Sequence, residues 1–160
     1  MNTSIRNPAG KKVICRNKQA FRDYFISDTY EAGLVLQGSE VKSLREGRAN
    51  LSDAYIAVRG DELFMVGSHI SEYPWANQFN HIPKRERKLL MHRQEIRRIK
   101  VKILERGFTL IPLQLYFLSG KAKVEIGLAK GKKQYDKRES VKERDVNRDV
   151  TAELSRRDKR

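Results

Sequence analysis

The chain has 160 residues, with 34 Lys or Arg against 20 Asp or Glu, which gives a formal net charge of +14. This length suits one domain with its own core, and such an excess of cations destabilises a compact chain by self-repulsion. The alternative explanation is that the charged side chains only keep the protein soluble, but solubility does not require more cations than anions. We therefore expect a polyanionic partner, of which RNA or DNA is the commonest.

The single cysteine, Cys15, excludes an internal disulfide framework and a cysteine-based zinc site, and it is typical of a reducing compartment. The N-terminus lacks the apolar stretch of a secretory signal. The longest unbroken apolar run is the five residues 54–58, whereas a membrane-spanning helix needs about 20. We therefore expect a cytoplasmic protein with no membrane contact.

Composition divides the chain into three parts. Residues 1–12 are polar and predict a flexible arm, and residues 13–130 hold nearly all the large apolar side chains and predict the folded domain. Residues 131–160 form a basic tail with too few apolar residues to offset its ordering entropy, so we expect this tail to be disordered when free.

In chain order, the first elements mix strands with a short helix. The apolar triplet 13–15 predicts a packed strand, and a further strand covers 31–36 and ends at Gly38. A short helix is predicted over 39–45, with Ser39 as its N-cap and Gly47 beyond its end. A hairpin pairs 54–59 with 63–67 across a turn at 60–61.

The second half predicts a helix and a longer hairpin. Ile96, Ile99 and Ile103 share one helical face, and Gly107 follows as a stop signal. The alternating strand 122–128 pairs with 109–118 across a turn at 119–121, and Pro112 indicates a strand edge or a bulge. The expected fold is mainly β with short helices (α+β): a small antiparallel sheet curled into a barrel, with about three flanking helices.

The usual catalytic and metal patterns are absent from the sequence. The histidines, His69, His81 and His92, stand more than ten residues apart without a second ligand at a recognised spacing. The segment 127–133 lacks the spacing of a phosphate-binding loop, although its glycines let lysines approach phosphates closely. A nuclease is suggested only by scattered carboxylates, Asp53, Asp61 and Glu62, which are better interpreted as turn and loop residues.

Basic clusters are the strongest signal. Residues 83–106 carry ten Lys or Arg against three Glu, and the cations around the isoleucine stripe predict a mostly positive outer helix face. A run of charged residues is more often simply a solvent-exposed helix face. A face with equal numbers of cations and anions would be just as soluble, so the excess of cations favours an anionic ligand. Tyr135 has only polar neighbours and can stack on a base, which is worth about 1–3 kcal/mol.

Three strings are more specific: EAGLVLQGSEVKSLREGRANLSDAY at 31–55, RKLLMHRQEI at 87–96 and KVEIGLAKGKKQYDKRE at 123–139. Together they resemble the SsrA-binding protein family (small protein B, SmpB), over about residues 10–143. The resemblance implies an oligonucleotide-binding-like barrel without catalysis, cofactor or metal. It implies a monomer that binds the tRNA-like domain of transfer-messenger RNA (tmRNA) and travels with elongation factor Tu to stalled ribosomes. There the tail becomes helical and probes the decoding centre and the empty mRNA channel.

The resemblance also assigns candidate contacts. In the body, Glu31 would accept from a base amino group or ribose hydroxyl, Leu90 would cover an unstacked base, and Lys123 would neutralise a phosphate. The other candidates for tmRNA contact match family motifs, some of them as scaffold: Asn17, Lys18, Tyr24, Glu40, Lys42, Arg45, Asn50 and Lys88. Glu40 can equally pair with a neighbouring cation.

The tail candidates would contact the ribosome. They are Lys130, Lys132, Lys133, Tyr135, Asp136, Lys137 and Arg138. Many family members have His where this chain has Tyr135, a change that keeps stacking but loses a protonated imidazole. The alternative function is a ribosome-associated or general single-strand nucleic-acid-binding barrel protein.

Overall fold

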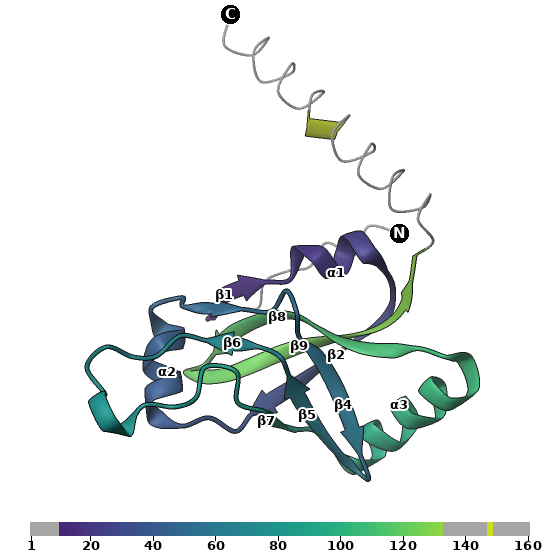
Figure 1. The fold of residues 1–160 in the computed structure, drawn as a ribbon. Helices are drawn as coiled ribbons and strands as arrows, with labels where there is room; N and C mark the ends of the chain where they lie inside the picture. The colour runs from purple at the N-terminus through teal and green to yellow at the C-terminus, as the bar shows by residue number, and fades with distance from the viewer. Residues whose placement is uncertain (1–9, 133–146, 149–160) are drawn as a thin grey trace, which may run out of the picture.

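The computed structural model describes residues 10–132 and 147–148 (Figure 1). The first half of the fold runs β1 (Lys11–Arg16), α1 (Lys18–Asp23), β2 (Tyr24–Leu34), α2 (Gly38–Arg45), β3 (Ala49–Asn50), β4 (Tyr55–Arg59) and β5 (Glu62–Val66). The second half runs β6 (His69–Ile70), the 3-10 turn η1 (Asn77–Phe79), β7 (Arg87–Leu90), α3 (Arg93–Arg106), β8 (Thr109–Leu118) and β9 (Lys121–Gly131).

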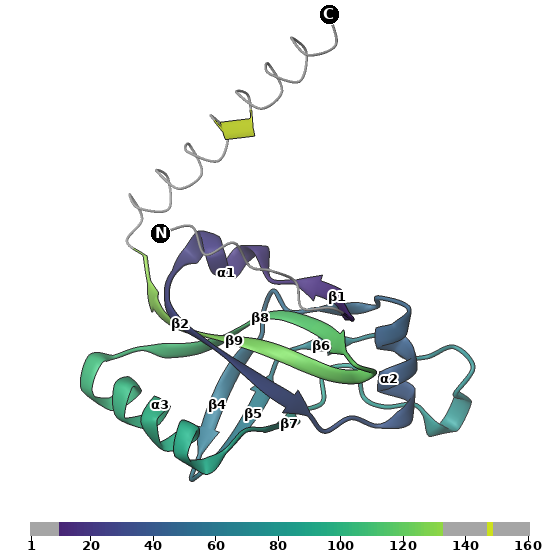
Figure 2. The same cartoon turned by 180° about the vertical axis from the view of Figure 1, so that it is seen from behind.

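Seven strands form one antiparallel sheet in the order β1-β8-β9-β2-β7-β5-β4, and β3 pairs with β6 in a separate ribbon. The shorter strands β4, β5 and β7 cross beneath the long strands β2, β8 and β9, so the sheet is strongly curled (Figures 1 and 2). Its two end strands, β1 and β4, are not hydrogen-bonded to each other in the part of the chain that the structure describes. The expected α+β fold is confirmed, although the sheet is an open, barrel-like curl rather than a closed barrel.

Both predicted hairpins form. Strands β4 and β5 pair from Tyr55↔Val66 to Arg59↔Glu62, and β8 pairs with β9 along its whole length. The register shifts between Pro112 and Gln114, so the proline marks a bulge and not a sheet edge. The strand predicted from Glu31 begins at Tyr24 instead, because the polar run 27–29 hides its first half in the sequence.

The helices follow local signals with two differences. Helix α3 ends as predicted at Gly107, which has φ 66° and donates its backbone N–H to the Ile103 carbonyl. Helix α2 is preceded by Gln37, whose N–H donates to the Glu40 carboxylate at 3.0 Å, so the N-cap is not Ser39. The sequence analysis did not identify α1, a helix of six residues that is capped by Asn17.

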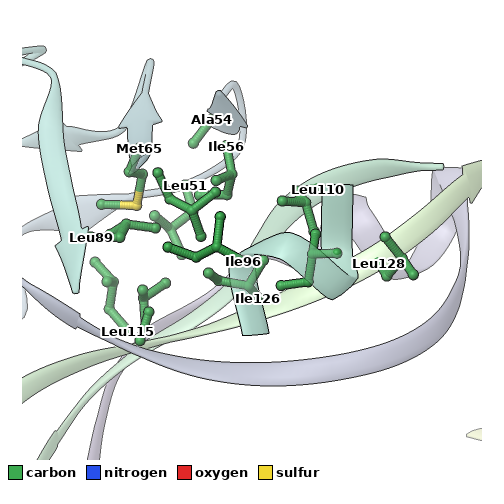
Figure 3. Close-up of a cluster of buried hydrophobic side chains, with 14 of the residues drawn as sticks. Leu51, Ala54, Ile56, Met65, Leu89, Ile96, Leu110, Leu115, Ile126 and Leu128 are labelled. Carbon is green, nitrogen blue, oxygen red and sulfur yellow. The ribbon is translucent and has the colours of Figure 1, made fainter. Parts of the chain in front are cut away.

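One apolar cluster lies between the long strands, the crossing strands and α3. Leu115 and Ile126 reach it from the long hairpin, Met65 and Leu89 from the crossing strands, and Ile96 from α3 (Figure 3). The isoleucine stripe of α3 therefore faces the core, as predicted. None of the helices in the described ranges is both long enough and apolar enough to cross a membrane.

Candidate nucleic-acid interface

An open groove of about 840 Å³ runs along β2, β7, β9 and the first turn of α3. Its lining includes Glu31, Leu90 and Lys123, so the structure brings together three candidates that lie far apart in the sequence. It also includes Lys88, which was predicted as a contact, and His92 and Arg93, which were not.

Strand register explains this convergence. Gly33 of β2 pairs with Leu90 of β7 on one side and with Lys123 of β9 on the other. Glu31 lies two residues before Gly33 and therefore on the same face of the sheet. A Cβ on Gly33 would lie 3.4 Å from the Leu90 Cβ, so the glycine lets the leucine lie across the row.

Two groups hold the carboxylate of Glu31. The Tyr116 hydroxyl donates a hydrogen bond to Oε2, and the Lys123 Nζ lies 3.7 Å from Oε1. The Glu31 side chain remains 47% exposed, so it keeps acceptor capacity toward solvent. Burial and the bond to Glu31 raise the pKa of Tyr116, which keeps the phenol protonated as a donor.

Leu90 and Lys88 alternate with buried residues along β7. Leu90 is 54% exposed although it is a large apolar side chain on a sheet, which suits contact with an unstacked base. The Lys88 Nζ lies 3.0 Å from the Glu62 carboxylate at the surface. Lys88 is therefore partly neutralised, whereas Leu90 is open to a ligand.

A second recess, of about 550 Å³, lies beside α1. Lys18 and Asn50 line it together with Arg16 and Arg22, which were not predicted. Lys18 is exposed, and the exposed Asn50 accepts the Ser52 N–H at 2.8 Å. This recess is also cationic, but Lys18 and Asn50 do not line the groove of Glu31.

Asn17 and Tyr24 have structural roles. Asn17 is 3% exposed, and its side chain donates to the carbonyls of Leu51 and Pro112 while it caps α1. Tyr24 is half-buried and packs against the smaller apolar cluster around Ala20. Asn17 is therefore one of the motif residues that act as scaffold, because its polar atoms are used inside the fold.

For Glu40 the structure shows the ion pair with neighbouring cations that the sequence left open as an alternative to RNA contact. Glu40 is 0% exposed and forms ion pairs with Arg85 at 2.8 Å and with the fully buried Arg87 at 3.2 Å. Its role is to anchor α2 to β7, and RNA cannot reach it in this fold. Lys42 and Arg45, on the same helix, are exposed.

Several cations of the basic run 83–106 are neutralised by ion pairs with carboxylates of the fold. Arg85 and Arg87 converge on Glu40, Arg97 and Lys100 lie 3.7 Å and 3.6 Å from Asp61, and Lys102 lies 2.8 Å from Asp28. The outer face of α3 is therefore less positive than its sequence predicts. The structure does not support the nuclease hypothesis. Asp61 and Glu62 are paired with cations, and among the described residues no three His, Cys, Asp or Glu side chains are grouped so that they could hold a metal ion.

The base of the tail is part of the sheet. Strand β9 continues to Gly131, one residue beyond the predicted domain end, and the Lys132 N–H donates to the Asp23 carbonyl at 2.8 Å. The Lys130 and Lys132 ammonium groups lie 5.2 Å and 4.9 Å from the ring centres of Phe108 and Phe25. The remaining tail candidates lie outside the described residues: Lys133, Tyr135, Asp136, Lys137 and Arg138.

Sequence reasoning missed Tyr116. Its register partner on β9 is Lys123, and its hydroxyl reaches Glu31 on β2, the strand on the far side of β9. The signal was the predicted pairing of 109–118 with 122–128, which places alternate residues on one face. The pairing with β2 could not be inferred in the same way, because a long connection separates β2 from the hairpin.

Comparisons with known proteins identify relatives of this chain. Residues 14–156 match the family model described as SmpB protein. The SsrA-binding protein of Geobacter metallireducens is 54% identical over 150 residues, which cover 94% of this chain and 98% of that protein. The SsrA-binding protein of Geobacillus kaustophilus is 52% identical over 153 residues, covering 95% and 99% respectively.

One solved structure is also similar. A chain described as "tmRNA-SmpB: a journey to the center of the bacterial ribosome" aligns with a TM-score of 0.64 and 41% sequence identity. The alignment covers 79% of this chain and 93% of that chain.

Proposed function

Because this chain belongs to the SmpB protein family, we propose that it binds the tRNA-like domain of tmRNA and delivers it to stalled ribosomes for trans-translation. One observation carries the proposal. Leu90, Gly33 and Lys123 form a cross-strand row beside Glu31, so an apolar side chain, a cation and a carboxylate face one groove.

Each group of the row suits a different part of a folded RNA. Lys123 approaches a phosphate, Leu90 covers an unstacked base, and Glu31 accepts from a ribose hydroxyl or a base amino group. The carboxylate matters most for selectivity, because it repels phosphates and is useful only where a donor of the RNA meets it. This arrangement supports a shaped ligand rather than general attraction to polyanions.

The folded body and the C-terminal tail have separate roles in this proposal: the groove of the body binds tmRNA, and the tail contacts the ribosome. Lys130 lies near the end of β9 and Lys132 directly follows the strand, and the tail beyond them probes the decoding centre and the empty mRNA channel. The protein acts as a monomer on one RNA, in the cytoplasm, together with elongation factor Tu and without catalysis of its own. The net charge of +14 supports a polyanionic partner such as RNA.

A competition assay tests the proposal. The full chain is bound to labelled tRNA-like domain and challenged with either the same unlabelled RNA or an unstructured strand of equal length. The proposal requires the folded RNA to compete far better at equal salt. Equal competition would support the general single-strand binder instead.

Removal of the tail tests the division of roles. A chain that ends at Lys132 should bind the tRNA-like domain almost as tightly as the full chain does, since the groove lies within the body. The same chain should fail to rescue stalled ribosomes in a reconstituted translation assay. Loss of RNA binding on truncation, or full rescue without the tail, would contradict the proposed division.

A further inference from the structure

The connection between β6 and β7, residues 71–86, exposes three large apolar side chains within eight residues. Trp75 and Phe79 are each 79% exposed and Ile82 is 71% exposed. The groove at Glu31 does not include them. Exposed apolar side chains gathered in one segment commonly mark an interaction surface.

This 71–86 loop is held by hydrogen bonds along its length. The Asn80 side chain accepts the Tyr73 N–H at 2.9 Å and donates to the Tyr73 carbonyl at 2.8 Å, which closes the tip. The buried His81 ring lies 2.8 Å from both the Ser39 hydroxyl and the Ile70 carbonyl. The exposed side chains are therefore displayed from a fixed backbone.

The charges around the loop favour an anionic partner. The Lys42 ammonium lies 5.5 Å from the centre of the Tyr73 ring, and Lys84 of the loop itself is exposed. At the base of the loop, Arg85 and Arg87 share the single carboxylate of Glu40, so one guanidinium charge is left in excess. The loop itself carries two carboxylates, Glu72 and Glu86. Glu86 is paired with Arg59 at 2.6 Å, so the remaining cations outnumber Glu72.

An aromatic side chain beside cations is the arrangement that binds unpaired bases, because the ring stacks on the base while the cations approach the phosphates. An apolar protein partner would need no cations, and a duplex would offer no base faces. The chemistry therefore favours a single-stranded or looped nucleotide of RNA.

The position of the loop indicates which RNA. Both views show it projecting past α2, at the end of the molecule away from α3 (Figures 1 and 2). The groove of Glu31 is instead lined by the first turn of α3. None of the described loop residues lines that groove, so a ligand seated in the groove does not need to cover the loop, and we assign the loop to a second RNA.

We propose that the 71–86 loop stacks Trp75 on an unpaired base of ribosomal RNA when the RNA-bound protein reaches the ribosome. Lys42 and Lys84 approach the flanking phosphates, which assigns Lys42 to ribosomal RNA in place of the tmRNA contact that the family resemblance implies. The inference rests on the proposed function, since it assumes that the groove is occupied by tmRNA. It adds a contact to the ribosome made by the folded body rather than by the tail.

Trp75 is the single tryptophan of the chain, which provides a direct probe. The full chain is labelled biosynthetically with 5-hydroxytryptophan, which can be excited apart from the tryptophans of ribosomal proteins. The labelled chain is saturated with the tRNA-like domain and then titrated with ribosomes. Stacking requires that ribosomes quench the label and that the tRNA-like domain alone leaves its emission unchanged.

Substitutions give the second measurement. Trp75→Ala should weaken binding of the protein–RNA complex to ribosomes about fivefold, near the lower end of the effect of losing one stacked base. Trp75→Phe should restore most of that affinity. Leu104→Ala is the matched control, since Leu104 is 82% exposed on α3, and it should leave ribosome binding unchanged.

Several results would overturn the inference. They are an unquenched label on ribosomes, quenching by the tRNA-like domain alone, and equal ribosome binding by Trp75→Ala and Leu104→Ala. Failure of the unsubstituted chain to bind the tRNA-like domain would instead contradict the proposed function, and the two failures are therefore distinguishable.

Discussion

The hydroxyl of Tyr116 donates a hydrogen bond to the carboxylate of Glu31 across the sheet, although 85 residues separate them in the chain. Tyr116 is 3% exposed, and the Lys11 ammonium lies 4.2 Å from the centre of its ring. The tyrosine is thus fixed while the carboxylate that it holds is accessible. A carboxylate held in one orientation loses less side-chain entropy when it binds a ligand.

Tyr116→Phe should therefore weaken binding of the tRNA-like domain through Glu31. Loss of one side-chain constraint is worth about 0.5–1.5 kcal/mol, so we expect a rise in Kd of roughly twofold to thirteenfold. In a Glu31→Ala background the same substitution should have almost no further effect, because no carboxylate remains to be oriented. The double-mutant cycle is measured by equilibrium binding at constant salt.

Thermal unfolding of the four proteins in this cycle separates positioning from folding. A purely structural role for Tyr116 would lower the melting temperature and weaken RNA binding equally with or without Glu31. Additive effects on Kd would contradict the positioning role even if every variant folds.

Lys123→Gln should make RNA binding less dependent on salt. Each neutralised phosphate contributes about 0.7–0.9 to the slope of log K against log salt, so the slope should become shallower by about that amount. The control is Lys102→Gln, since Lys102 pairs with Asp28 at 2.8 Å and does not line the groove. An unchanged slope for Lys123→Gln would mean that this ammonium contacts no phosphate.

Leu90→Ala should weaken RNA binding without affecting the fold. Leu90 is 54% exposed, so its truncation removes little buried area in the free protein. A base that covers this side chain would lose about 1 kcal/mol of apolar contact. Kd should rise roughly fivefold while the melting temperature stays within error, and an unchanged Kd would exclude Leu90 from the interface.

Local patterns in the sequence predicted much of the sheet. The alternation over 122–128 and the isoleucine stripe before Gly107 each depend on residues close in the chain, and both elements form as expected. The first half of β2 was missed because its polar residues 27–29 do not show an apolar alternation. Short α1 was missed because six residues contain too few turns to show a period.

The site was harder to predict, because its contacts join distant segments. Glu31, Leu90 and Lys123 were assigned through family resemblance, but their meeting depends on the β7-β2-β9 register. For Glu40 the sequence left open an RNA contact or an ion pair, and only the fold identifies its partners, Arg85 and Arg87, which are 45 and 47 residues away. Composition alone cannot distinguish such a buried ion pair from an RNA-binding charge.

Gly67→Ala should destabilise the β5–β6 connection strongly. Gly67 has φ +78°, and an added Cβ would lie 2.6 Å from the Asp53 carbonyl oxygen, a contact that the backbone can relieve only by moving. Gly60→Ala is the matched control, since it has φ +63° and nothing within 4 Å of the added Cβ. A left-handed conformation alone costs a non-glycine residue roughly 1 kcal/mol, so Gly67→Ala should cost clearly more. Denaturant unfolding of both variants measures the difference, and equal costs would contradict the backbone clash.

The ion-pair cluster of Glu40, Arg85 and Arg87 should make the stability of the fold depend on pH in the acidic range. Burial disfavours the charged carboxylate, but hydrogen bonds from Arg85 and the Gln37 N–H and the two guanidinium charges outweigh it, so the pKa of Glu40 lies below its ordinary 4.5. A lowered pKa in the folded state means that the charged form stabilises the fold above pH 4.5 and that this stabilisation is lost as the pH falls toward the folded pKa.

Glu40→Gln tests this dependence, because glutamine keeps the shape but cannot be charged. At pH 7 the substitution leaves the fully buried Arg87 without its counter-ion and should cost about 3 kcal/mol, as expected when one partner of a buried ion pair is removed. Below pH 4.5 the difference in melting temperature between the unsubstituted chain and Glu40→Gln should narrow, since the native carboxylate becomes protonated.

If Glu40→Gln does not fold at pH 7, the acid unfolding curve of the unsubstituted chain and that of Arg85→Gln still test the cluster. Loss of the partly exposed Arg85 should raise the pH at which stability falls, and an unchanged midpoint would contradict its role in holding the carboxylate charged.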